Sequence, residues 1–82
     1  MRIINVRHAL HFFARSENLE NNLEKLRKEK HITQEELADI LKVSRQTISS
    51  IENGRYEPSI NLAFKLALFF NKTIEEIFIY RK

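Results

Sequence analysis

Two short patterns constrain the fold of this 82-residue chain more than any other feature of its sequence. In each, a threonine is followed three residues later by a glutamate: Thr33 with Glu36, and Thr73 with Glu76. This spacing is typical of the capping box, in which each side chain accepts a hydrogen bond from the other residue's backbone N–H at the start of a helix. The chain's one glycine and one proline fall in a single turn, and no stretch alternates long enough to indicate a strand. The sequence therefore predicts short helices with defined ends.

Apolar spacing and end signals together predict five helices. The first begins at Leu23, the second runs from about Gln34 to Leu41, the third follows the candidate cap Ser44 and ends at Gly54, the fourth runs from about Ile60 to Phe70, and the fifth opens at Thr73. The predicted fold class is all-α. We expect one five-helix domain over residues 21–82, with residues 1–20 as an N-terminal extension.

The extension differs from the rest of the chain in charge. Residues 1–16 contain three arginines and no acidic residue, whereas the remainder has equal numbers of basic and acidic residues, so the net charge of +3 comes from the extension. Its apolar residues recur at helical spacing (Ile3, Val6, Leu10, Phe13), which is compatible with a sixth, amphipathic helix. Three roles stay open for it: a dimerisation element, a basic arm along DNA phosphates, or an extension without a role.

Composition excludes several classes of protein. The chain has no cysteine, which rules out disulfides and cysteine-based zinc or redox sites, and its three histidines are not spaced as metal ligands. We therefore expect no metal and no cofactor. No run approaches the roughly 18 apolar residues of a membrane span, so a soluble, cytoplasmic protein is expected. No nucleophile–base pair, carboxylate dyad or glycine-rich phosphate loop can be assembled, so an enzyme is not expected.

The third predicted helix, in the stretch SRQTISSIENG, has an unusual polar side. At about 100° per residue, one arc of roughly 140° holds only polar residues: Arg45, Gln46, Ser49, Ser50 and Asn53. The opposite arc holds Ile48 and Ile51. One side would be buried while the other presents hydrogen-bonding groups without apolar obstruction. Arg and Gln on such a helix can pair with guanine and adenine in the DNA major groove.

The surrounding residues resemble a known family. The stretch from Thr33 to Ser59, TQEELADILKVSRQTISSIENGRYEPS, resembles the Cro/CI-type helix-turn-helix domain of phage repressors and of the xenobiotic-response-element group of regulators. The resemblance extends from about Asn22 to Phe78. It implies a phage-repressor-like fold of five helices, in which the second and third form the DNA-reading unit, with double-stranded DNA as the partner.

Carried over by position, the resemblance also implies roles for individual residues. Base contacts are expected from Ser44, Arg45, Gln46 and Ser50. Phosphate contacts are expected from Gln34, Thr47, Asn53 and Arg55. Arg27 and Glu52 are expected to form a structural ion pair beneath the third helix, because an unpaired carboxylate at the rim of a buried arc is costly.

The expected function is a sequence-specific transcriptional regulator, a repressor that binds a pseudo-palindromic operator as a homodimer. Two alternatives stay within the same fold: the antitoxin of a toxin–antitoxin pair, with the toxin as protein partner, or the controller of a restriction system. An alternative of another class is a helical adaptor that binds protein and never DNA. Steep, salt-dependent retention on duplex DNA would separate the regulator from the adaptor.

Overall fold

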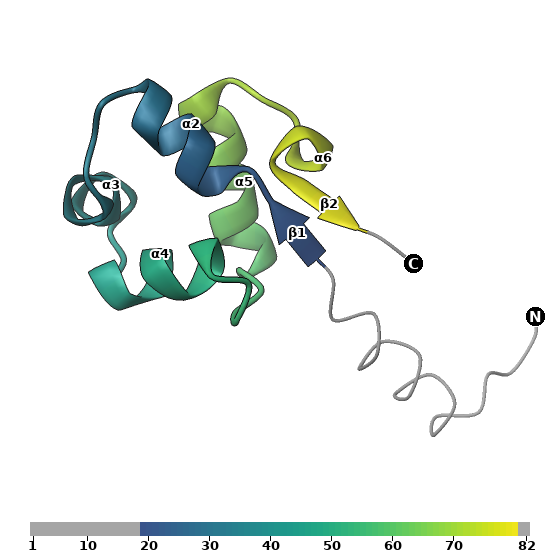
Figure 1. The fold of residues 1–82 in the computed structure, drawn as a ribbon, viewed down its shortest axis with the longest axis horizontal. Helices are drawn as coiled ribbons and strands as arrows, with labels where there is room; N and C mark the ends of the chain where they lie inside the picture. The colour runs from purple at the N-terminus through teal and green to yellow at the C-terminus, as the bar shows by residue number, and fades with distance from the viewer. Residues whose placement is uncertain (1–18, 81–82) are drawn as a thin grey trace, which may run out of the picture.

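The computed structural model describes residues 19–80 as five helices and one two-stranded sheet (Figure 1). In chain order the elements are β1 (Leu19–Asn21), α2 (Leu23–Glu29), α3 (Gln34–Leu41), α4 (Arg45–Glu52), α5 (Ile60–Phe70), α6 (Ile74–Ile77) and β2 (Phe78–Tyr80). The five predicted helices are confirmed. The candidate sixth helix falls in residues 1–18, outside the described residues.

Both predicted capping boxes form. The Thr33 hydroxyl accepts from the N–H of Glu36 at 3.0 Å, and the Glu36 carboxylate accepts from the N–H of Thr33 at 2.8 Å. The same pair of bonds joins Thr73 and Glu76 at the start of α6, at 3.1 and 2.8 Å. These side chains satisfy N–H groups that have no partner within the helix, and so fix where each helix begins.

Three of the described helices, α3, α4 and α5, end at a residue whose backbone is in the left-handed region. Lys42 closes α3 with a φ of 62° and Asn71 closes α5 with a φ of 55°. Gly54, directly after the C-cap of α4, has a φ of 75°. Asparagine and glycine tolerate this region best, which explains why the sequence alone located the ends of α5 and α4.

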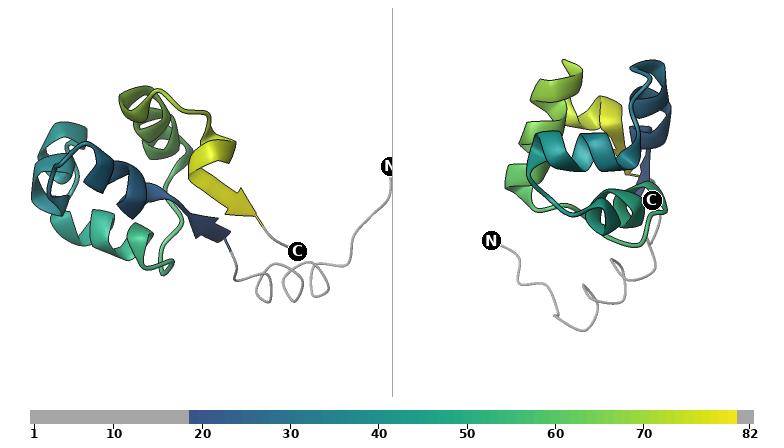
Figure 2. Two further views of the ribbon diagram at one scale, coloured as in Figure 1. Left: turned by 45° about the horizontal axis from the view of Figure 1, so that its top comes forward. Right: turned by 90° about the vertical axis from the view of Figure 1, so that its left-hand side faces the viewer.

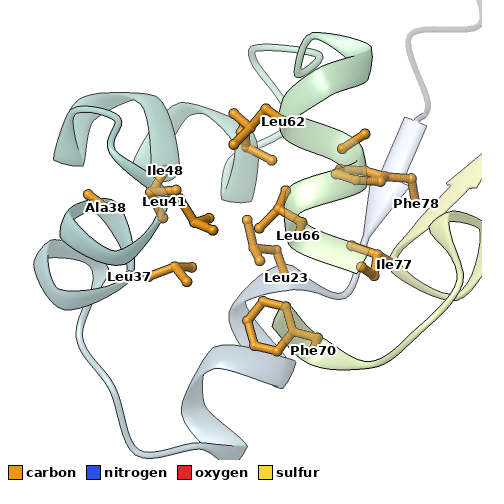
Figure 3. Close-up of a cluster of buried hydrophobic side chains, with 12 residues drawn as sticks. Leu23, Leu37, Ala38, Leu41, Ile48, Leu62, Leu66, Phe70, Ile77 and Phe78 are labelled. Carbon is orange, nitrogen blue, oxygen red and sulfur yellow. The ribbon is translucent and has the colours of Figure 1, made fainter. Parts of the chain in front are cut away.

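The core draws one or more side chains from every helix (Figure 3). Its fully buried members are Leu23, Leu37, Ile48, Ile51, Leu66 and Ile77. α3 packs against α4 and α5, α2 packs against α4, and α6 packs against α5. In Figure 1 and in the left view of Figure 2, α3 lies at the end of the domain opposite the sheet, and α4 runs from that end toward β1, where the side chain of Asn21 donates to the carbonyl of Ile51. No helix within residues 19–80 is long and apolar enough to cross a membrane.

The sheet was not expected from the sequence. β1 and β2 pair antiparallel, with Leu19 opposite Tyr80 and Asn21 opposite Phe78. Phe78, assigned from the sequence to the apolar set of the fifth helix, is instead the first residue of β2, although it is buried as expected. Strands of three residues are too short to show an alternating pattern in the sequence, and the two strands that pair lie about 60 residues apart in the chain.

Candidate DNA-binding site

α4 is held by one side and exposed on the other. Ile48 and Ile51 are buried in the core, as predicted. On the opposite side lie the five residues that we call the recognition face: Arg45, Gln46, Ser49, Ser50 and Asn53. Arg45, Gln46 and Asn53 are exposed, and the two serines are half-buried. The long side chains of Arg45 and Gln46 therefore extend beyond the short side chains of the two serines.

Ser44 and Thr47 form the start of this helix. The Ser44 hydroxyl accepts from the N–H of Thr47 at 3.1 Å, and the two hydroxyl oxygens are 2.8 Å apart. Ser44 thus acts as the N-cap, and its hydroxyl has local partners in addition to its expected base contact. The N–H groups of Arg45 and Gln46, in the first turn, have no acceptor within the helix.

An ion pair ties α4 to α2. The guanidinium of Arg27 contacts the carboxylate of Glu52 twice, through Nε at 2.7 Å and Nη2 at 3.2 Å. Nη1 donates to the backbone carbonyl of Ile32 at 2.8 Å. The two side chains are 9% and 3% exposed, and the hydrogen bond to Glu52 raises the pKa of Arg27. The negative charge of Glu52 is thereby balanced beneath the recognition face.

Gln34 joins the same network. Its side-chain Nε2 donates to Oε1 of Glu52 at 2.9 Å. The expected phosphate contact of Gln34 would therefore compete with a bond that links the start of α3 to the end of α4. Sequence spacing gave no sign of this bond, because its two residues are 18 positions apart.

Two shallow grooves border α4, one along the helix and one at its N-terminal end, and bring most of the expected contact residues together. One is lined by Ser44, Gln46, Thr47, Ser50, Arg55 and Tyr56. The other lies between α2 and α3 and includes Thr33, Gln34 and Arg45. Asn53, at the C-terminal end of α4, lines neither of these two grooves.

Tyr56 is a candidate site residue that the sequence reasoning missed. Its side chain is 48% exposed and lines the first groove beside Arg55. A phenol can donate a hydrogen bond to a phosphate oxygen, as Tyr does in many protein–DNA interfaces. The available signal was its position next to Arg55 in the turn that follows the recognition helix.

The local charge is basic without being large. Lys42, Arg45 and Arg55 are exposed near the recognition face, while Glu52 is neutralised by Arg27. Within residues 19–80, no three His, Asp or Glu side chains gather in a way that could hold a metal ion. This surface can therefore bind a ligand through hydrogen bonds and through attraction between its basic side chains and negative charge.

Comparison with known proteins assigns the scaffold. A family model described as a helix-turn-helix matches residues 23–77, more than half of the chain. The chain belongs to the Cro/CI-type helix-turn-helix family. The match begins with the first residue of α2 and ends with the last residue of α6, so the helix-turn-helix domain comprises all five described helices.

Several relatives of this helix-turn-helix protein are named as transcriptional regulators. It is 55% identical over 62 residues to an uncharacterised HTH-type transcriptional regulator of Methanocaldococcus jannaschii, covering 76% of this chain and 94% of that protein. It is 37% identical over 60 residues to a further such regulator of Bacillus subtilis, covering 73% and 91%. It is 42% identical over 55 residues to the HTH-type transcriptional activator BcrR of Enterococcus faecalis, covering 67% of this chain and 27% of that protein. The protein is a DNA-binding transcriptional regulator and not an enzyme.

Proposed function

We propose that this protein occupies an operator as a dimer, with α4 of each copy in the major groove, and that occupancy represses the adjacent gene. The observation that carries the proposal is the two-sided character of α4. Its buried isoleucines and the Arg27–Glu52 pair hold the helix in place, and Arg45 and Gln46 project into solvent at its N-terminal end. Helix-turn-helix proteins place base-contacting residues at this end of the recognition helix.

Base contacts are assigned to four residues, Ser44, Arg45, Gln46 and Ser50. Arg can bind guanine O6 and N7 together, and Gln can bind adenine N6 and N7. The shallow groove that runs past Gln46 and Ser50 supports close approach, because no large apolar side chain projects from the recognition face. Arg45 is expected to dominate specificity.

Phosphate contacts are assigned to Gln34, Thr47, Asn53 and Arg55, with Tyr56 added from the structure. The starts of α3 and α4 both carry N–H groups without helical acceptors, which favour anions. These two helix starts border the same second groove, through Gln34 and Arg45. They would hold the sugar–phosphate backbone on one side of the major groove, with Arg55 and Tyr56 on the other.

Dimerisation follows from the small size of the contact surface. One recognition helix reads only a few base pairs, so a second copy on a half-site about one helical turn away would supply the missing affinity. Selection of bound duplexes from a random pool tests this directly. A symmetric consensus, with half-site centres about 10 base pairs apart, is the expected result.

Two variants then separate specificity from general attraction. Arg45→Ala should cost about 1 to 3 kcal/mol on the selected operator and relax the preference at one position of each half-site. Arg55→Ala should weaken binding to all sequences alike and lower the slope of log K against log salt by about one per half-site. Lys65→Ala is the matched control, because Lys65 is an exposed base on α5 that lines neither groove beside α4.

The proposal fails if Arg45→Ala and Arg55→Ala give the same profile of loss across operator variants. It also fails if no duplex is enriched and retention on DNA does not depend on salt. That second result would favour the protein-binding adaptor.

A further inference from the structure

α5 has apolar side chains on two sides. One side contributes Leu62, Ala63, Leu66 and Phe70 to the core. The other carries Ile60, Phe64 and Leu68, which are 75%, 53% and 81% exposed. These three residues are four positions apart, so they form one continuous line along the helix, which we call the apolar stripe.

The apolar stripe is unusual for a surface that faces water. Single exposed apolar residues are common, but three large ones in contact usually mark a surface that something covers. DNA does not account for it, because none of the three lines either groove beside α4. The stripe therefore needs an occupant other than the operator, whether or not the proposed function is correct.

The described part of the chain begins close to one end of the stripe. β1 starts at Leu19, and the side-chain amide of Asn21 donates to the carbonyl of Ile51 at 2.8 Å. Asn21 also lines a small pocket with Tyr56 and Glu57, in the turn that leads into α5 (Figure 1). Ile60 follows this turn three residues after Glu57. The described chain therefore begins on the side of the domain from which α5 starts.

The sequence of residues 1–18 fits the stripe in length and in pattern. Ile3, Val6, Leu10 and Phe13 recur at helical spacing. A helix over residues 3–13 would be about 16 Å long, against about 12 Å between Ile60 and Leu68. The five residues that remain before Leu19 reach up to about 17 Å when extended, which is enough to place the helix alongside α5.

We propose that residues 3–13 pack as an amphipathic helix on the apolar stripe of their own chain. Two apolar surfaces that would each be exposed alone thereby cover one another. Tethering favours this occupant over a free partner, because the linker keeps the segment at a high effective concentration near the stripe. The role assigned to the N-terminal segment is thus to complete the domain rather than to contact phosphates.

The absence of cysteine makes the test simple, because one engineered cysteine accepts one spin label. In the full chain carrying Lys65→Cys, at the border of the stripe, a nitroxide should broaden the amide NMR signals of residues 3–13. A label on Glu35→Cys, an exposed position on α3, is the control and should broaden them much less. Equal broadening from both labels, or none from either, would overturn the proposal.

Two further measurements test which side of the N-terminal segment makes the contact and whether the segment comes from the same chain or from a second copy. Leu10→Glu should abolish the broadening from the Lys65→Cys label, while His8→Glu, on the opposite side of the predicted helix, should leave it in place. Mixing isotope-labelled chain with spin-labelled, unlabelled chain reports contacts between copies. Broadening in that mixture as strong as within one chain would show that a second copy supplies the segment, and would overturn packing within the chain.

Discussion

Replacing Glu52 by glutamine tests whether the ion pair beneath α4 holds the recognition helix in place. Glutamine keeps the shape of the side chain and removes its charge. Arg27 would then keep a positive charge at a site only 9% exposed, facing a neutral amide in place of the carboxylate, with the carbonyl of Ile32 as its other acceptor. Gln34 would also lose its carboxylate partner.

The expected loss of stability is about 3 kcal/mol. Removing one partner of a buried ion pair typically costs about 3 to 5 kcal/mol, and this pair lies at the edge of the core, which favours the lower end. A domain of this size has a urea m value of about 1 kcal/mol/M, so the urea midpoint should fall by about 3 M. Circular dichroism at increasing urea measures both quantities at neutral pH.

Two comparisons make the result specific. Lys28→Ala breaks the exposed pair of Lys28 and Glu24, whose side chains are 66% and 56% exposed, and should change stability by less than about 0.5 kcal/mol. The double variant Arg27→Met with Glu52→Leu replaces both charges by apolar groups and should recover most of the loss. If Glu52→Gln costs no more than Lys28→Ala, or if the double variant is as unstable as the sum of its single variants, the reasoning about a buried, mutually dependent pair is refuted.

Three further predictions concern the helix ends. Ser44→Ala should lower stability by about 1 kcal/mol through loss of the N-cap. Ser44→Asp should keep stability within about 0.5 kcal/mol, because Asp also caps helices, but should weaken operator binding by placing a carboxylate near the bases. If thermal stability and operator affinity changed in parallel in both variants, this prediction would be wrong. Gly54→Ala should lower stability by about 1 kcal/mol because the backbone φ is 75°, and not because of crowding, since nothing lies within 4 Å of an added Cβ. Gly54→Asn should therefore cost less stability than Gly54→Ala in urea melts. A larger loss with Asn would contradict this explanation. The backbone hydrogen bond from Thr73 lowers the pKa of the Glu76 carboxyl below 4.5. The stability that the ionised carboxylate contributes is therefore present above pH 4.5 and is lost as the pH falls through the lowered pKa. Between pH 7 and pH 3 the Tm should drop less in Glu76→Gln than in the unmodified protein, and equal drops would be evidence against the bond.

Local signals in the sequence were enough to place every described helix. The threonine and serine caps mark where α3, α4 and α6 begin, and Asn71 and Gly54 mark where α5 and α4 end. These signals are reliable because each depends on backbone groups within a few residues, and such interactions are the same in any fold.

Features that depend on distant residues were predicted unevenly. The pairing of Arg27 with Glu52 was expected from the family resemblance and from the cost of a buried carboxylate, and the structure places the two side chains together. The bond from Gln34 to Glu52 and the pairing of β1 with β2 were not expected. No local periodicity encodes them, because they arise only once the helices have packed.

The base and phosphate contacts themselves remain predictions. Most of the eight residues border one of two grooves beside α4, which agrees with a shared surface. Helical periodicity identified the outward side of α4 correctly, because Ile48 and Ile51 fix its rotation. It could not identify Tyr56, which lies beyond the helix in the turn.

The short sheet also determines what can be attached to this domain. Because Leu19 pairs with Tyr80, the chain enters and leaves the five-helix unit at neighbouring points. A few-residue linker could join these points, so a circularly permuted domain opened at an exposed turn should still fold, and the domain could be inserted into a loop of a host protein. A reporter fused directly to Leu19 or to Tyr80 would emerge from the same corner, on the side of the domain away from α3.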